Sequence, residues 1–171
     1  MKQTKIISKF LHYVCYILAM GYLISLFYSA FCLSTGFGIE SYDRDQFLHI
    51  NYPLGNQIFL IVENNISYIV FSFLLPLILY SIFFMLSTRL FKVFFQNPLF
   101  TQKNISELKR FYLFNIFVPL PIIIIASFFV DVESLILVLA FIHFILGIFS
   151  LFFANIFSEG LQLQNEQDLY I

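Results

Sequence analysis

Four long apolar runs limit what this chain can fold into. Only 11% of its residues are charged, against about 25% in a typical soluble domain, which is too few to cover a globule of this size with a wetted surface. Each run is long enough to cross about 30 Å of hydrocarbon at roughly 1.5 Å per residue. We therefore predict an all-α membrane protein whose four transmembrane helices cover about residues 10–33, 66–87, 112–130 and 134–157.

The first run follows a basic start that has no acidic residue, as a secretory signal peptide does. We interpret it as an uncleaved first span, because it is longer than a signal-peptide core and lacks a clean small-residue cleavage site. Prolines punctuate the later spans: Pro76 is expected to kink the second, and Pro119 and Pro121 interrupt the third.

The distribution of Lys and Arg predicts the orientation. Three lysines precede the first span, five cations lie in the segment 89–110, and Arg44 stands alone on the other side. Under the positive-inside rule, both termini and the loop 96–110 are cytoplasmic, and the loop 36–65 and the turn 131–133 face outward. This predicts a multi-pass protein of the inner (cytoplasmic) membrane, with the lipid bilayer as its first partner.

The outer loop 36–65 contains a hairpin pattern. Residues 46–52 alternate, residues 53–56 form a turn signal, and residues 57–62 are prone to form a strand. A short β-hairpin is one interpretation. An irregular loop is the other, since an isolated two-stranded hairpin is marginally stable in water.

The spans hold few groups that could do chemistry. Their central portions contain no Asp, Glu, Lys or Arg, and the single ionisable candidate is His143. His143 is either a proton-sensitive or metal-binding group, or a neutral imidazole hydrogen-bonded to a Tyr, a Ser or Asn115. Cys15 and Cys32 fit best as small hydrophobic residues of the first span.

These observations exclude several function classes. No nucleophile–base or acid–base pair lies at one membrane depth, so we predict that the chain is not an enzyme and carries no cofactor or metal. The net charge is −1 and the basic residues adjoin the spans, so we expect attraction to anionic lipid rather than direct binding to nucleic acid. The sequence does not exclude that the chain forms a homo-oligomer.

Two cytoplasmic segments carry motifs. The first runs Asn97-Pro98-Leu99-Phe100-Thr101, continues through Asn104, and ends in Lys109-Arg110; the second places Glu166, Asp168 and Leu169 after Gly160. Thr101 is expected to cap the next helix, and Gly160 to end the fourth.

Together these motifs resemble a bacterial integral-membrane family of unknown function. Its cytoplasmic loop reads Pro-Phe-Thr-x-x-Asn followed by a Leu-Arg pair, and its members end in Glu-x-Asp-Leu. Leu99 and Tyr170 depart from that pattern. The resemblance implies a four-helix membrane bundle. Because members are often encoded beside a small helix-turn-helix regulator, it also implies that they hold such a regulator at the membrane.

We therefore expect a non-enzymatic membrane anchor or regulator with a cytoplasmic partner surface. The acidic tail could dock on Lys103 and its basic neighbours, or it could bind the partner directly. A small transporter or channel subunit is an alternative, and an envelope sensor that uses the outer loop is another. The expected partner-binding residues are Phe100, Thr101, Asn104, Lys109, Arg110, Glu166, Asp168 and Leu169.

Overall fold

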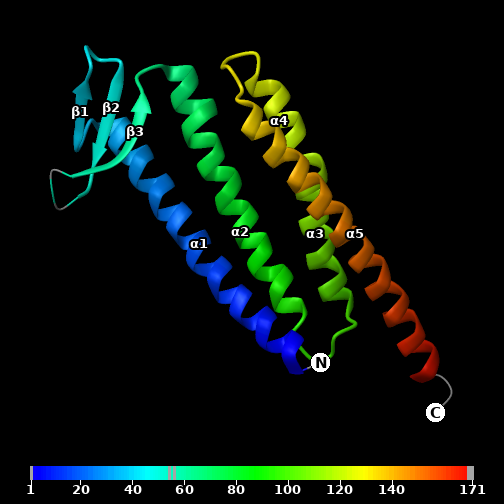
Figure 1. Cartoon of the computed structure of the whole chain (residues 1–171). Coiled ribbons are helices and arrows are strands. Elements are labelled where there is room, and N and C mark those ends of the chain that lie inside the picture. Colours follow the sequence, from blue (N-terminus) through cyan, green and yellow to red (C-terminus); the bar gives the residue numbers. More distant parts are fainter. Residues whose placement is uncertain (1, 54, 56, 169–171) are drawn as a thin grey trace.

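The computed structural model describes residues 2–53, 55 and 57–168. The helix α1 leads into a small sheet, and the π-helix η1 then runs directly into α2 (Figure 1). The elements in chain order are α1 (Lys2–Thr35), β1 (Ile39–Tyr42), β2 (Phe47–Asn51), β3 (Ile58–Glu63), η1 (Tyr68–Leu74), α2 (Leu75–Val93), α3 (Gln102–Phe117), α4 (Pro119–Ala126) and α5 (Ser134–Asp168).

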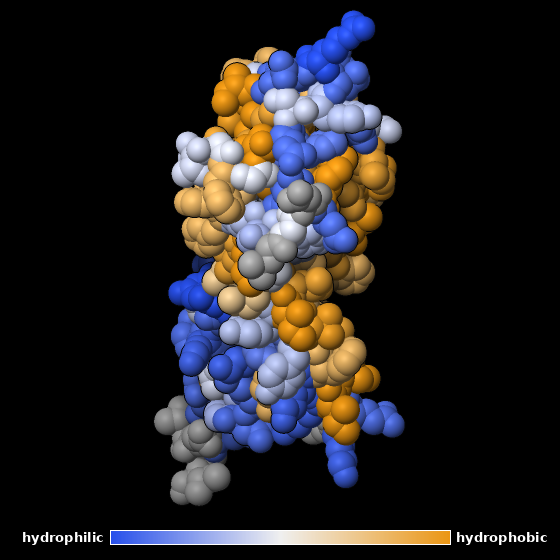
Figure 2. Space-filling model, turned by 90° about the vertical axis from the view of Figure 1, so that its left-hand side faces the viewer, coloured by the Kyte–Doolittle hydropathy of each residue, from blue (hydrophilic) through white to orange (hydrophobic). Residues whose placement is uncertain are grey.

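The predicted apolar helices are confirmed, and each is longer than its apolar run. Within the part of the chain that the structure describes, four helical stretches are long and apolar enough to cross a membrane: Lys2–Thr35, Tyr68–Val93, Gln102–Ala126 and Ser134–Gln167. On the face shown in Figure 2, hydrophilic residues gather at the top and bottom, and hydrophobic residues form much of the surface between them. Four helices of this length and composition suggest a multi-pass membrane protein.

The helices form two pairs. α1 packs along α2, α3 packs along α5, and contacts between α2 and α3 join the pairs. The sheet lies at one end of the molecule, which we call the sheet end. The N-terminal residues of α1, the connection between α2 and α3, and the last turns of α5 lie at the other, which we call the loop end (Figure 1).

The expected hairpin is confirmed as part of a larger sheet. β2 and β3 pair antiparallel, as the alternation predicted, and β1 adds a third strand on the other side of β2. The sequence analysis missed β1 because its turn to β2 contains no glycine. Instead, Asp43, Arg44 and Asp45 all adopt positive φ angles of 50–66°. The hydroxyl of Tyr28 in α1 donates to the backbone carbonyl of Asn51 and ties the sheet to the helix.

Prolines shape two of the spans. At Pro76, where a kink was expected, the helix changes type: the π-helix η1 ends immediately before α2, and Pro76 lies in the first turn of α2. Pro cannot donate the backbone hydrogen bond that a continuous α-helix needs there. The predicted interruption of the third span is confirmed, since α3 ends at Phe117 and α4 begins at Pro119.

The expected end of the fourth helix at Gly160 is wrong. α5 continues to Asp168, so much of the tail is helical. Gly160 serves packing instead, because a Cβ atom built on it would lie 2.8 Å from the ring of Phe100. Gln, Glu and Leu then prolong the helix, as their helix propensities allow. We call residues 158–168 the α5 extension.

The packed core lies towards the loop end. It joins α2, α3 and α5 through Val93, Leu108, Ala154 and Phe157. Further along the same contact, Gly147 of α5 meets α3 so closely that a Cβ atom there would lie 2.5 Å from Cγ1 of Ile116. Small residues allow this close backbone approach between membrane helices.

We predict opposite effects for two Gly→Ala substitutions. Gly147→Ala places a methyl group against Ile116 and should lower the midpoint of thermal unfolding in neutral detergent. Gly21→Ala meets nothing within 4 Å and should leave the midpoint unchanged or raise it, because alanine is the better helix former. A decrease of equal size in both variants would contradict a tight α3–α5 contact.

Candidate functional site

Three of the expected partner-binding residues turn inward at the loop end. The Thr101 hydroxyl accepts a hydrogen bond from the backbone N–H of Asn104 at 3.1 Å, which confirms the predicted cap. The Asn104 side chain is 2% exposed, and its amide donates to the carbonyl of Leu99 at 2.7 Å. The Phe100 ring packs edge-on against the ring of Phe157. These side chains therefore hold the loop in shape.

Two other expected residues remain at the surface. Lys109 and Arg110 are exposed on α3, and Arg110 forms an ion pair with Glu107 one turn earlier, at 3.2 Å. This is the one ion pair among residues 2–53, 55 and 57–168. With the exposed Lys103, these cations form a basic surface beside the start of α3.

The expected docking of the tail on this basic surface is not found for Glu166. Its carboxylate instead accepts a hydrogen bond from the side chain of Gln162 in its own helix, at 3.1 Å. The physical reason is the length of α5: the helix carries Glu166 about 9 Å beyond Gly160, at 1.5 Å per residue. The side chain of Asp168 and all of Leu169 lie outside the described residues.

The α5 extension is exposed over most of its length. Glu159, Glu166 and the polar residues between them face outward, and Leu163 is 61% exposed. The base of the extension is fixed, because Gly160 lies against Phe100 and Phe157 is buried in the core. The loop end therefore presents an acidic helix on a packed base, together with a basic surface on α3.

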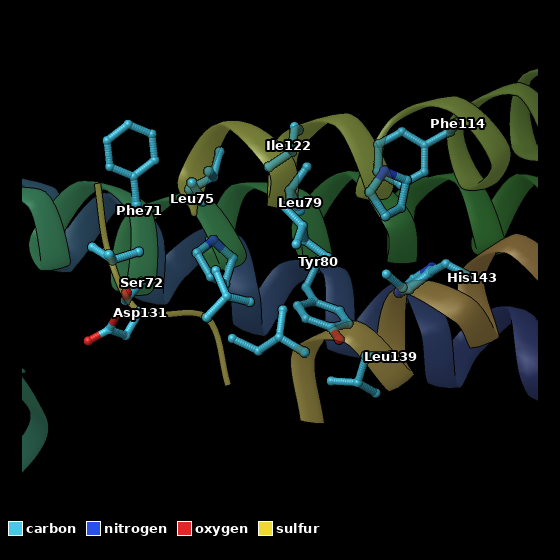
Figure 3. Close-up of a pocket in the computed structure, with 18 residues that line it drawn as sticks. Phe71, Ser72, Leu75, Leu79, Tyr80, Phe114, Ile122, Asp131, Leu139 and His143 are labelled. Carbon is cyan, nitrogen blue, oxygen red and sulfur yellow. The ribbon is translucent and has the colours of Figure 1, made fainter. Parts of the chain in front are cut away.

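The sheet-end half of the molecule holds a cavity that the sequence analysis missed. Its volume is about 330 Å³, and it lies between η1–α2, α4 and α5. We call it the sheet-end cavity. Figure 3 shows Phe71, Ser72 and Asp131 towards one end, and Tyr80 and His143 towards the other. Its lining residues are Phe71, Ser72, Leu75, Pro76, Leu79, Tyr80, Phe114, Pro119, Ile122, Ile123, Ala126, Val130, Asp131, Val132, Ile136, Leu139, Ala140 and His143.

His143 is held in place from α3. Its Nδ1 lies 2.7 Å from Oδ1 of Asn115, and the Asn115 amide nitrogen donates to the carbonyl of Phe111 at 2.8 Å. This confirms the interpretation that His143 hydrogen-bonds to Asn115. Because a carbonyl only accepts, the Asn115 amide nitrogen must face Phe111 and its oxygen must face His143. Nδ1 then carries a proton, and in the neutral ring Nε2 is an acceptor.

Comparison with known proteins does not indicate a function for this chain. No protein-family model, curated protein or solved structure matches it. The candidate sites are therefore defined by geometry. They are the α5 extension with the neighbouring basic surface at the loop end, and the sheet-end cavity.

We predict that Thr101 and Asn104 act on stability. Thr101→Val removes the cap and should cost about 1 kcal/mol of unfolding free energy. Asn104→Ala leaves the carbonyl of Leu99 without its donor and should cost about 1–3 kcal/mol. Both values are measured by reversible denaturation in mixed micelles.

Lys103→Ala is the matched control, because Lys103 is exposed on the same turn. Its unfolding free energy should stay within about 0.5 kcal/mol of the parent value. A normal stability for both Thr101→Val and Asn104→Ala would show that these residues do not hold the loop.

Proposed function

We propose that the protein is a non-enzymatic, multi-pass membrane protein that anchors or regulates a cytoplasmic partner. The observation that carries this proposal is the α5 extension, an exposed helix that continues beyond the apolar core. The excess of Lys and Arg at the loop end favours a cytoplasmic position for it, with both chain termini inside.

The chemistry of the α5 extension favours a protein partner. It carries Glu159, Glu166 and Asp168, has no Lys or Arg, and exposes Leu163. An acidic helix with one exposed apolar side chain fits a groove with an apolar pocket and a basic rim. Exposed ion pairs contribute at most about 1 kcal/mol each, so the apolar contact of Leu163 would supply much of the affinity.

The fixed base of the helix supports the same reading. Phe100 and Phe157 hold the first turn of the α5 extension against the core. A partner that binds a preformed helix loses less conformational entropy than one that must order a flexible tail. The resemblance in the two cytoplasmic motifs adds a class of partner, a small helix-turn-helix regulator.

A small transporter or channel subunit is the second candidate function. The sheet-end cavity and the helix interruptions at η1 and Pro119 favour it. The packed core at the loop end disfavours a continuous transport path through the molecule. Solute flux in liposomes that contain only this chain would support this candidate, and impermeable liposomes would remove it.

We predict that partner binding depends on the α5 extension. After crosslinking in cells and purification in mild detergent, the parent chain should retain a small DNA-binding protein. A chain truncated after Gly160 should lose it, and Leu163→Asp should reduce its yield about ten-fold, because the charge removes the apolar contact.

Phe152→Ala is the matched control, since Phe152 is exposed on the same helix within the apolar span. It should retain the partner at the parent level. Retention by both the truncated chain and Leu163→Asp would move the contact to Lys103, Lys109 and Arg110 and contradict the assignment to α5. If the parent chain retains no cytoplasmic protein, the anchor function is wrong.

A further inference from the structure

The sheet-end cavity has the form of a ligand site. Its volume of about 330 Å³ lies at the lower end of the range of small-molecule sites, roughly 300–1,000 Å³. Leu, Ile, Val, Phe and Pro side chains line most of it. Such a wall offers few hydrogen bonds to water, which needs two to four polar partners to be held in place. The cavity is therefore suited to an apolar group.

The polar atoms among the lining residues favour a ligand whose polar group donates hydrogen bonds. Asp131 is the one formally charged side chain among the described lining residues, and its carboxylate only accepts hydrogen bonds. In the neutral ring, Nε2 of His143 is also an acceptor, because Nδ1 carries the proton that faces Asn115. The hydroxyls of Ser72 and Tyr80 can donate or accept. The cavity thus disfavours an anion and complements a cation at Asp131.

The polar groups also indicate an elongated ligand. Ser72 and Asp131 lie towards one end of the cavity, and Tyr80 and His143 lie towards the other (Figure 3). Ser72 and Tyr80 are eight residues apart on the continuous helix η1–α2, which corresponds to about 12 Å. A narrow chain of that length would fill the space between α2, α4 and α5.

We propose that the sheet-end cavity binds a lipophilic amine with a single alkyl chain. Its ammonium group contacts the carboxylate of Asp131, and its chain lies among the apolar side chains of α2, α4 and α5. This site is separate from the partner surface at the loop end, so the inference does not depend on the proposed function.

In a membrane, the head group of the ligand determines how selectively the cavity binds it. An alkyl chain that moves from lipid into the cavity gains little from the hydrophobic effect, since lipid tails are as apolar as the cavity wall. Selectivity must therefore come from the contact with Asp131, which is exposed at the connection between α4 and α5. Ligands with one chain and different head groups test this directly.

The experiment uses the full chain in neutral detergent micelles and three probes: dodecylamine, 1-dodecanol and dodecyl sulfate. Native mass spectrometry counts the bound molecules, and thermal unfolding measures the stabilisation. Dodecylamine should bind as one molecule per chain and raise the unfolding midpoint. Dodecanol should bind about ten-fold more weakly, and dodecyl sulfate should give no specific adduct. Equal binding of all three probes, or no adduct with dodecylamine, would overturn the proposal.

Two pairs of variants locate the site. Asp131→Asn should weaken dodecylamine binding about ten-fold, whereas Glu133→Gln should not, because Glu133 does not line the cavity. Ala140→Phe should fill the cavity and abolish binding. Val138→Phe on the same helix is its control, since Val138 is 55% exposed and lies outside the lining.

If Ala140→Phe fails to fold, the comparison of Asp131→Asn with Glu133→Gln still decides the outcome. A similar loss in these two variants would mean that dodecylamine responds to surface charge and would overturn the assignment to the cavity. The unfolding midpoint of each variant without ligand shows whether the fold is preserved.

Discussion

The contact between α3 and α5 is the interaction on which both candidate sites depend. Gly147 lets the two backbones approach, the Ser150 hydroxyl donates to the carbonyl of Leu108 at 3.2 Å, and His143 binds Asn115. Ala154 and Phe157 continue the same face of α5 into the core. In a bilayer, where apolar surfaces gain little by meeting, small residues and hydrogen bonds of this kind hold helices together.

Both candidate sites begin where this contact stops. At the loop end, Phe100 packs against Gly160 and Phe157, and beyond them α5 runs free of α3. Towards the sheet end, α3 finishes at Phe117 and α4 takes its place. The packing is less complete there, and the sheet-end cavity opens between α2, α4 and α5. The molecule is therefore well packed where α3 meets α5 and leaves a cavity where this contact ends.

Features encoded within a short stretch could be predicted from the sequence. The apolar runs predicted the four helices, and Thr101 predicted a helix cap. The alternation in 46–52 and the strand-prone run in 57–62 indicated the β2–β3 hairpin as one of two interpretations. A hydrogen bond from His143 to a Tyr, a Ser or Asn115 could be predicted because few polar side chains lie within the spans, and the structure shows Asn115 as the partner. Each of these predictions needed only local spacing or composition.

Features that depend on distant contacts could not be predicted. Gly160 resembles a helix stop, but the ring of Phe100, sixty positions earlier, makes it a packing residue. Phe100, Thr101 and Asn104 fitted a partner surface equally well until their inward contacts were seen. β1 was hidden by a turn of three non-glycine residues with positive φ, and the cavity depends on how three separate helices pack.

The proposed function requires that the loop end of the molecule lie on the cytoplasmic side of the membrane. The α5 extension must be cytoplasmic to bind a cytoplasmic partner. The sheet and Asp131 then lie on the outer side. The charge bias favours this orientation.

The most direct measurement is thiol labelling of intact cells with a membrane-impermeant maleimide. Ser41→Cys and Gln164→Cys would each be introduced into a chain whose two cysteines, both buried, are replaced by alanine. Ser41 and Gln164 are exposed at opposite ends of the molecule. We predict that the Ser41→Cys variant is labelled in intact cells and the Gln164→Cys variant only after permeabilisation. Labelling of the Gln164→Cys variant in intact cells would contradict this prediction.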